Sequence, residues 1–281
     1  SLAFFEPSLA LHRYGSNTGP RKGWAAAEAS AQSVRFAHMA VAGEPGYPQV
    51  LTHPKWGFNK VFFGGEEFRN TIDFGCRVMT GVLFKIQAPV VIHAQSAVEA
   101  AIRMHGELNG RFDDIARIEL HSHNRTLAII DKTGPLRNAA DRDHCLQYAV
   151  AVALLHGRLN ASDYEDEAAA DPRIDRLRGL RQLTERETYT QAYRDPGRTL
   201  NPNSIQVFFT DGSQTPLIEV LQPLGDPARR AEGIPLLVEK FERSVTKRFA
   251  RKQAESIIQL CLEHDRLLAM PVPAFTDMLS I

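Results

Sequence analysis

Two basic residues directly precede an expected helix near the start of the chain, and an anion is the ligand that suits this placement. Arg21 and Lys22 follow Gly19-Pro20, a helix-start signal, and precede a helix predicted over Trp24–Val41. The free N–H groups and the dipole already make a helix N-terminus electropositive, so two added cations are unfavourable there. An isolated Arg-Lys pair is usually solvated, and the helix start beside it makes an anion-binding site an equal alternative.

Two later helix starts repeat this pattern. His93 lies just before or within the first turn of a helix predicted over Ala94–Leu108. The stretch DRDH, which includes Arg142 and His144, opens the next predicted helix, which is expected to end at Gly157. Aspartates are expected as caps at a helix start, whereas Arg142 and His144 there are suited to binding an anion. A lone histidine beside a helix is usually structural, so the recurrence of the pattern, more than any one residue, indicates anion binding.

A pair of histidines in the middle of the chain does not make a metal site. His121 and His123 alternate with apolar residues on a predicted strand and share one face with Glu119. An H-x-H pair needs a third ligand, and none is obvious nearby. A partly exposed polar strand face explains all three residues, so we expect no bound metal.

Composition excludes several classes of partner. Among 281 residues, Lys+Arg and Asp+Glu number 33 each, so no overall basic field favours nucleic acid or an anionic membrane. The odd, widely spaced cysteines Cys76, Cys145 and Cys261 argue for a reducing compartment without disulfides or a thiolate zinc site. With no apolar run near ~20 residues and no signal-peptide pattern, we expect a cytoplasmic protein, or one of the mitochondrial matrix if the source is eukaryotic.

The elements that must position these residues change character twice along the chain. Residues 1–86 are predicted as helices and loops, residues 87–222 mix strands and helices, and residues 223–281 return to helix, after a loop in which Arg229 and Arg230 are expected in solvent. In the middle part, residues 115–130 alternate like a strand, and residues 203–223 form the clearest hairpin. We predict an α+β fold in which an α+β domain is inserted into a helical one.

Six stretches, in order and at matching spacing, resemble the MmgE/PrpD family, and within it the branch that dehydrates methylcitrate. The resemblance runs from about Leu11 to the C-terminus, and the part KTGPLRNAADRDHCLQY is specific to that branch. The stretches are NTGPRKGWAAAEAS, GYPQVLTHPKWGF, HAQSAVEAA, IIDKTGPLRNAADRDHCLQYAVA, LLHGRLNASDYED and GIPLLVEKF.

The resemblance implies a fold and an activity. A large helical domain is interrupted by a smaller α+β lid, the active site lies in the cleft between them, and no iron–sulfur cluster or other cofactor is needed. The expected lyase reaction dehydrates 2-methylcitrate, and also citrate, in the methylcitrate cycle of propionate catabolism, so the partner is a small tricarboxylate. Alternatives are cis-aconitate decarboxylation, iminodisuccinate epimerisation, or an inactive fragment with only an assembly role.

The resemblance also assigns residues. Lys22 falls on the family's active-site lysine, and Arg21 precedes it in the dehydratase branch. The decarboxylase relatives carry a different histidine where this chain has Val91, which weakens the decarboxylase alternative. Lys22 is the expected stabiliser of developing charge or an acid, and Arg21 is expected to bind a substrate carboxylate.

Four lid residues complete the expected site. His93 and Gln95 match the family's H-x-Q at the first lid helix, and Arg142 and His144 match its D-R-D-H. The resemblance implies that His93 and His144 are catalytic, one of them protonating the leaving hydroxyl, and that Gln95 and Arg142 bind substrate.

One departure from the family bears on the activity of this chain. The family's helical domain includes a long N-terminal half with a catalytic histidine and acid residues, and no counterpart is found in these 281 residues. The chain also begins without Met, so we expect it to be the later portion of a longer protein, with the catalytic base in the other portion. Alone, we expect it to be inactive and either to pair with another chain, as in a homodimer, or to be poorly soluble.

Overall fold

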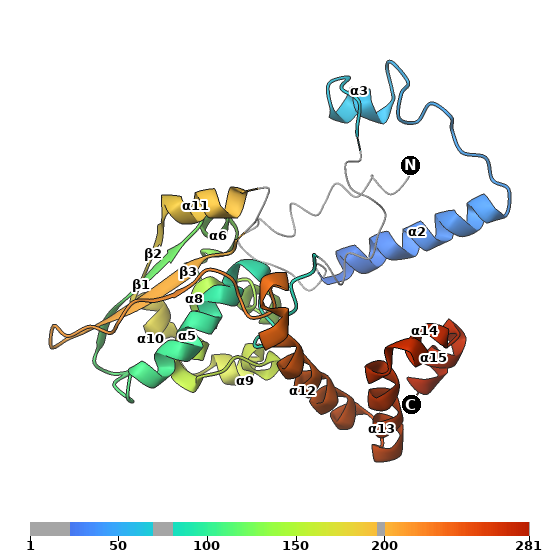
Figure 1. The fold of residues 1–281 in the computed structure, drawn as a ribbon. Helices are drawn as coiled ribbons and strands as arrows, with labels where there is room; N and C mark the ends of the chain where they lie inside the picture. The colour runs from blue at the N-terminus through green and yellow to red at the C-terminus, as the bar shows by residue number, and fades with distance from the viewer. Residues whose placement is uncertain (1–22, 70–80, 196–199, 281) are drawn as a thin grey trace.

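A small mixed sheet is the centre of the fold. The computed structural model describes residues 23–69, 81–195 and 200–280, and its sheet has the strand order β2-β1-β3-β4 (Figure 1). Strand β1 runs parallel to β2 and antiparallel to β3, which is antiparallel to β4. The α+β fold predicted from the sequence is therefore confirmed. The strands are β1 (Ile115–Ser122), β2 (Arg181–Glu185), β3 (Asn203–Phe209) and β4 (Ile218–Val220).

The core is built from helices that pack against this sheet and against one another. Helix α5 (Gln95–Glu107) contacts β3, β4 and α8 (Leu146–His156), and α10 (Pro172–Gly179) contacts α8. The α8 sequence LQYAVAVALLH is apolar on nearly every side, and its first ten residues are all buried, as expected for a helix enclosed by others. The main apolar cluster draws its residues from Ala88 to Val220.

The predicted end of α8 is confirmed. Gly157 follows the helix with φ of 63°, a left-handed conformation that glycine adopts without steric cost. A short helix, α7 (Ala139–Arg142), precedes α8, and η4 (Ala161–Tyr164) and α9 (Asp166–Ala169) follow it.

The strand predicted over residues 115–130 is correct only in its first half. Strand β1 ends at Ser122, and α6 (Asn124–Ile130) follows. In this second half the buried positions are Thr126 and Ile130, which are four apart and share one helical face. Helix α6 contacts β2, α11 (Glu187–Arg194) and the 3₁₀ turn η3 (Ile92–Ala94). These elements gather where the parallel strands β1 and β2 end.

The hairpin predicted over residues 203–223 is present, with β3 and β4 as its arms. Gly212 lies in the connection with φ of 86°, and a bridge between Phe208 and Gln214 extends the pairing toward the turn.

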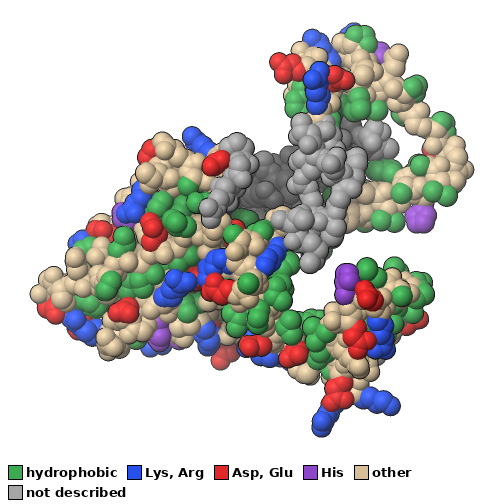
Figure 2. Space-filling model, in the orientation of Figure 1, with side chains coloured by type: hydrophobic (Ala, Val, Ile, Leu, Met, Phe, Trp, Pro, Cys, Tyr) green, Lys and Arg blue, Asp and Glu red, His purple; other side chains and the backbone are tan. Residues whose placement is uncertain are grey.

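Helices on either side of this unit expose much apolar surface. Helix α2 (Ala25–Val41), predicted from the sequence, stands apart from the sheet in Figure 1 and leaves Trp24 68% and Val41 88% exposed. Helix α3 (Phe58–Phe62) belongs to a group of aromatic rings in which Phe58 is half-buried and Phe62 and Phe68 are exposed. Hydrophobic side chains are visible on the surface of this part of the chain in Figure 2. The chain ends in α12 (Arg230–Arg248), α13 (Arg251–Leu262), α14 (His264–Ala269) and α15 (Val272–Met278).

The segments that enter and leave the sheet-bearing unit run side by side. The backbone N–H of Phe84 donates to the carbonyl of Gly225 over 3.0 Å, and Arg230 Nη2 donates to the carbonyl of Val82 over 2.6 Å. A Cβ atom on Gly225 would lie 1.6 Å from the Phe84 carbonyl oxygen, so only glycine fits this crossing.

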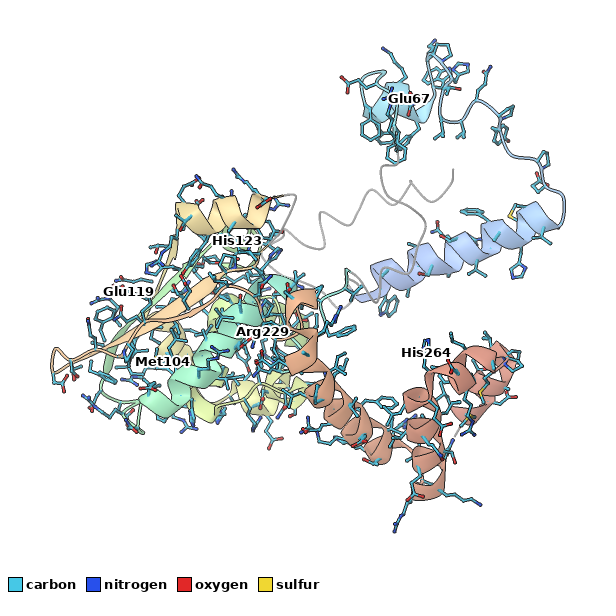
Figure 3. All side chains as sticks on the ribbon, in the orientation of Figure 1. Glu67, Met104, Glu119, His123, Arg229 and His264 are labelled. Carbon is cyan, nitrogen blue, oxygen red and sulfur yellow. The ribbon has the colours of Figure 1, made fainter. Side chains whose placement is uncertain are left out.

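The expectation that Arg229 is solvated is wrong. Arg229 ends the 3₁₀ turn η5 (Pro227–Arg229), and its guanidinium lies 2.8 Å from the carboxylate of Glu99 on α5 (Figure 3). Glu99 is buried and needs a cationic partner, which a sequence pattern in the distant loop does not reveal.

Candidate functional site

Four of the six predicted site residues can be placed. Arg21 and Lys22 lie outside the described residues, so the other four, His93, Gln95, Arg142 and His144, define the candidate site. All four are buried, and they belong to two groups of contacts, one at η3 and the start of α5 and the other around α7.

His93 belongs to a group of three rings at the end of the sheet. Its imidazole meets the His123 ring edge-on, with centroids 5.4 Å apart, and the Tyr193 ring in the same manner at 5.7 Å. The rings of His123 and Tyr193 are stacked almost parallel, at 4.0 Å and 6°. The view in Figure 3 places His123 beneath α11, the helix that carries Tyr193.

Two asparagines hold the backbone of the His93 turn. Asn201 Nδ2 donates to the carbonyl of Ile92 over 2.5 Å, and Asn203 Nδ2 donates to the carbonyl of His93 over 3.2 Å. Asn203 also donates to Ser96 Oγ on α5, over 2.7 Å. The start of β3 therefore fixes the turn that carries His93.

The Asn201 side chain reaches His123 as well. Its Oδ1 lies 2.8 Å from His123 Nε2, and Thr126 Oγ1 lies 3.1 Å from the same nitrogen. His123 is fully buried, and burial lowers the pKa of its imidazole, because the charged form loses its hydration. Sequence reasoning missed Asn201, Asn203 and Tyr193, since these contacts span 70 to 110 residues and leave no local pattern.

His121 and His123 do not share a strand face, contrary to the prediction, because β1 ends between them. His121 is partly exposed, with Nδ1 2.7 Å from Thr184 Oγ1 on β2. His123 follows the end of the strand and is buried. In the part of the chain that the structure describes, no group of three or more His, Cys, Asp or Glu side chains could hold a metal ion.

Gln95 ties down the segment that leads into η3. Its Nε2 donates to the carbonyls of Ala88 and Val90, over 3.0 and 2.7 Å. Both amide protons are thereby used, so only the amide oxygen of Gln95 is available as an acceptor for a substrate hydroxyl.

Arg142 does not lie at the start of a long helix, contrary to the sequence interpretation. It is the last residue of α7, and α8 begins four residues later at Leu146. Its buried guanidinium donates through Nη1 to the carbonyl of Tyr164 over 2.6 Å and pairs through Nη2 with Asp166 over 2.7 Å. The Asp166 side chain is 90% exposed, so this ion pair is open to solvent on one side.

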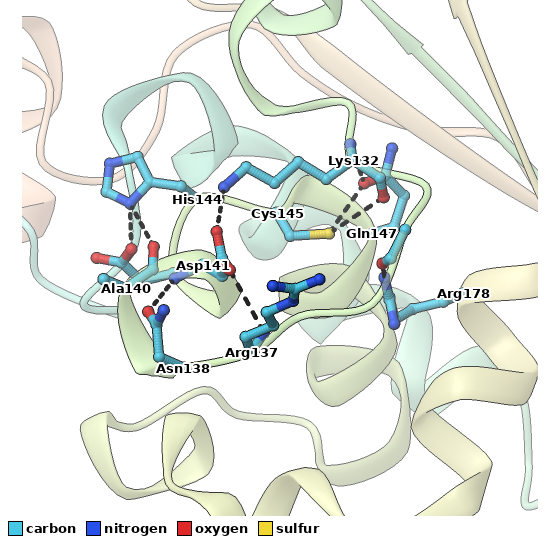
Figure 4. Close-up of polar contacts among 11 residues, drawn as sticks. Lys132, Arg137, Asn138, Ala140, Asp141, His144, Cys145, Gln147 and Arg178 are labelled. Carbon is cyan, nitrogen blue, oxygen red and sulfur yellow. Dashed lines mark hydrogen bonds and ion pairs between the residues drawn. The ribbon is translucent and has the colours of Figure 1, made fainter. Parts of the chain in front are cut away.

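His144 lies between α7 and α8, in the loop drawn in Figure 4. Its Nδ1 contacts Asp143 Oδ1 and lies 3.1 Å from the carbonyl oxygen of Ala140. The helix start expected at this residue is wrong, because the backbone leaves the helix between Arg142 and Leu146.

A buried ion pair that the sequence interpretation missed supports the same loop. Lys132 Nζ lies 3.0 Å from Asp141 Oδ1, with side chains 11% and 0% exposed (Figure 4). Asp141 also accepts the backbone N–H of Arg137 over 3.3 Å, and its own N–H donates to Asn138 Oδ1 over 3.0 Å. The stretch DKTGPLRNAADRDH is thus organised around one buried carboxylate.

No helix in the described ranges is long and apolar enough to cross a membrane.

Cys145 and Cys261 are both free. Cys145 is buried, and burial raises the pKa of its thiol, so it is a poor nucleophile.

Comparison with known proteins gives consistent matches along the chain. Residues 88–264 match the MmgE/PrpD C-terminal domain, and residues 3–71 match the MmgE/PrpD N-terminal domain. The 2-methylcitrate dehydratase of Cupriavidus necator is 49% identical over 100% of this chain and 59% of its own length. The Salmonella typhimurium 2-methylcitrate dehydratase is 46% identical over the same shares. The mitochondrial 2-methylcitrate dehydratase of Yarrowia lipolytica is 43% identical over 99% of this chain and 54% of its own length. The chain thus spans somewhat more than half the length of these relatives.

Proposed function

Because this chain belongs to the MmgE/PrpD family, we propose that its protein is a hydro-lyase that dehydrates 2-methylcitrate to 2-methyl-cis-aconitate. The proposal rests on the identity of this chain, 49% and 46% over its whole length, to two proteins named 2-methylcitrate dehydratase. The proposed role is in propionate catabolism, with citrate as a further substrate. We propose residues 1–86 and 223–281 as parts of the helical domain and residues 87–222 as the lid.

The reaction sets three tasks. The substrate carboxylates need cationic partners, the charge that grows beside a carboxylate as the proton leaves must be stabilised, and hydroxide must depart with a proton. We assign charge stabilisation to Lys22 and a carboxylate contact to Arg21. We assign the protonation of the leaving hydroxyl to His93 or His144, and place the base outside this chain.

Arg142 suits a carboxylate contact for a reason visible in its present partner. A buried guanidinium needs an anion, and Asp166, which supplies it, is 90% exposed. A solvent-exposed carboxylate is held weakly, so a substrate carboxylate could displace it at little cost. In this proposal Asp166 occupies the place of the substrate anion, and the carbonyl of Tyr164 keeps the guanidinium oriented.

A chimaera tests the proposal. The matching 59% of the Cupriavidus necator protein is replaced by this chain, and the absorbance of the conjugated product is followed with 2-methylcitrate. We expect turnover by the chimaera and none by the isolated chain, because residues that act as a catalytic unit are strongly non-additive. A folded chimaera that is inactive on 2-methylcitrate but decarboxylates cis-aconitate or epimerises iminodisuccinate would establish another family activity. A folded chimaera without any of these activities would support the assembly role.

A further inference from the structure

The amide of Asn201 joins the backbone beside His93 to the ring that packs against His93. Its nitrogen donates to the carbonyl of Ile92, one residue before His93. Its oxygen faces Nε2 of His123 at 2.8 Å. The amide orientation is fixed, because turning it over would set its oxygen against the Ile92 carbonyl oxygen. Asn201 is itself 8% exposed, so neither contact competes with bulk water.

This orientation determines where the proton of His123 lies. Since Asn201 presents an acceptor, Nε2 of His123 must be the N–H donor. Nδ1 is buried and has no hydrogen-bond partner among the described residues. Burying an unprotonated ring nitrogen without a partner costs less free energy than burying an N–H without one. The lack of a partner at Nδ1 therefore also favours the tautomer that is protonated at Nε2. His123 is therefore a neutral imidazole with its ring plane set by Asn201.

The fixed ring then limits the orientation of His93. His123 stacks on Tyr193 at 4.0 Å, and the edge-on contacts of 5.4 and 5.7 Å place the His93 imidazole against both rings. Thr126 Oγ1, 3.1 Å from His123 Nε2, holds the ring from α6. These neighbours of the His123 ring all limit its rotation.

We propose that Asn201 and His123 are positioning residues for His93: Asn201 fixes the turn backbone, and the His123 ring, held by Asn201 and stacked on Tyr193, fixes the imidazole. The proposal deepens the proposed function in that it assumes a role for His93 in the reaction. It assigns no contact with substrate to Asn201, His123 or Tyr193.

The first test is spectroscopic and needs no activity. Long-range proton–nitrogen correlation on ¹⁵N-histidine-labelled chain should show His123 at pH 7 as the neutral tautomer protonated at Nε2. Asn201→Ala should mix the His123 tautomers and shift the ring signals of His93. The matched control is His121→Phe, on β1 two residues before His123, which should leave the His93 signals in place. If Asn201→Ala unfolds the chain, Asn201→Asp serves instead, since it keeps the oxygen toward His123 and loses the donor to Ile92. Unchanged His93 signals in a folded Asn201 variant would overturn the proposal.

The second test separates ring stacking from hydrogen bonding in the chimaera with the Cupriavidus necator protein. His123→Phe keeps a ring against Tyr193 and loses the donor, whereas His123→Gln keeps a donor near the Nε2 position. We expect kcat to fall about 100-fold in the Phe variant with KM within about threefold, as for a misplaced catalytic group, and Gln to recover at least about tenfold. Equal kcat in His123→Phe and the parent would contradict positioning. If His93→Gln keeps full turnover while the spectroscopic result holds, the role of His93 in the reaction is wrong and the positioning contact stands.

Discussion

Arg229 donates through Nη1 to both oxygens of the buried Glu99 carboxylate, over 2.8 Å to Oε1 and 3.0 Å to Oε2. The other Glu99 contacts are the backbone N–H of Leu224, which donates to Oε2 over 2.9 Å, and Arg103 at 2.5 Å. The Glu99 side chain is 3% exposed. One carboxylate therefore fastens α5 to the segment by which the chain leaves the sheet.

Glu99→Ala should lower the free energy of unfolding by about 3 kcal/mol, because Arg229 would keep a largely buried charge with one anionic partner fewer. Urea denaturation followed by circular dichroism measures the change. Glu107→Ala, near the exposed end of the same helix, is the control and should change stability by less than about 0.5 kcal/mol. Equal stability of the two variants would show that the Glu99 contacts contribute nothing.

Gly225→Ala should destabilise the protein by about 3 kcal/mol or more, the upper range for overpacking, because the new methyl group would overlap the carbonyl of Phe84. Gly106→Ala is the matched control, since a Cβ there meets nothing within 4 Å and Gly106 lies inside α5. It should stabilise the protein by about 0.5 to 1 kcal/mol through helix propensity. Thermal denaturation of both variants gives the comparison, and a neutral Gly225→Ala would mean that the crossing of the two segments is loose.

His123 should make stability depend on pH on the acid side of neutrality. Burial lowers its pKa in the folded state, with Arg125 lowering it further and Asn201 and Glu185 opposing, so below pH 6.5 the unfolded chain binds the proton more readily. Stability is therefore present above pH 6.5 and is lost as the pH falls toward the lowered pKa, by at most about 1.4 kcal/mol per pH unit. His123→Phe should flatten this part of the urea-stability profile between pH 7 and pH 5. His264→Phe, at an exposed position on α14, should leave the slope unchanged.

Lys22→Ala should reduce turnover of the active chimaera by at least about 100-fold, the scale of a lost charge stabiliser or acid. The measurement is the initial rate of product absorbance at saturating 2-methylcitrate. Lys252→Ala, at an exposed position on α13, is the control for removal of a positive charge and should be fully active. Near-normal turnover by Lys22→Ala would refute the role assigned to that residue.

Chelation should leave the activity of the chimaera unchanged, because the tricarboxylate is expected to be bound by Arg and Lys side chains without a metal ion. Metal analysis of the purified protein, before and after treatment with a chelator, accompanies the assay. Stoichiometric zinc or iron that is lost together with activity would contradict this expectation.

The sequence predicted those elements whose signal is local. The apolar run of α8 with Gly157 after it, the long α2 and the β3–β4 hairpin all follow from spacing and turn residues over a short window. Strand β2 was not predicted because its sequence, RQLTE, is polar and half-exposed. It lies at the edge of the sheet, where packing requires little alternation of polar and apolar residues. The end of β1 was missed because the predicted strand was carried across Asn124–Ile130, where three polar residues are followed by four apolar ones and the alternation stops.

The candidate site divides in the same manner. His93 was singled out because it lies at the start of a recognisable helix, whereas Gln95 followed only from the resemblance. The family membership that the resemblance implied is confirmed. The partners of His93 could not be predicted, because His123 and Asn201 meet only after β1 and β3 have paired. The contact of Arg142 with Asp166 likewise depends on how α9 folds back on α7. The boundaries at residues 87 and 222 remain predictions, as do the roles of all six site residues.

The hydrogen bond between Phe84 and Gly225 brings two points 141 residues apart in the sequence to within 3.0 Å. The two ends of the intervening unit are therefore adjacent in the fold. A linker of roughly two or three residues could span the gap, so the intervening unit could be excised, or exchanged for that of a relative, without stretching the rest of the chain. The termini of the excised unit would lie side by side, so the unit could also be circularly permuted. Exchange of the intervening unit would therefore leave unchanged the distance that the flanking segments must span.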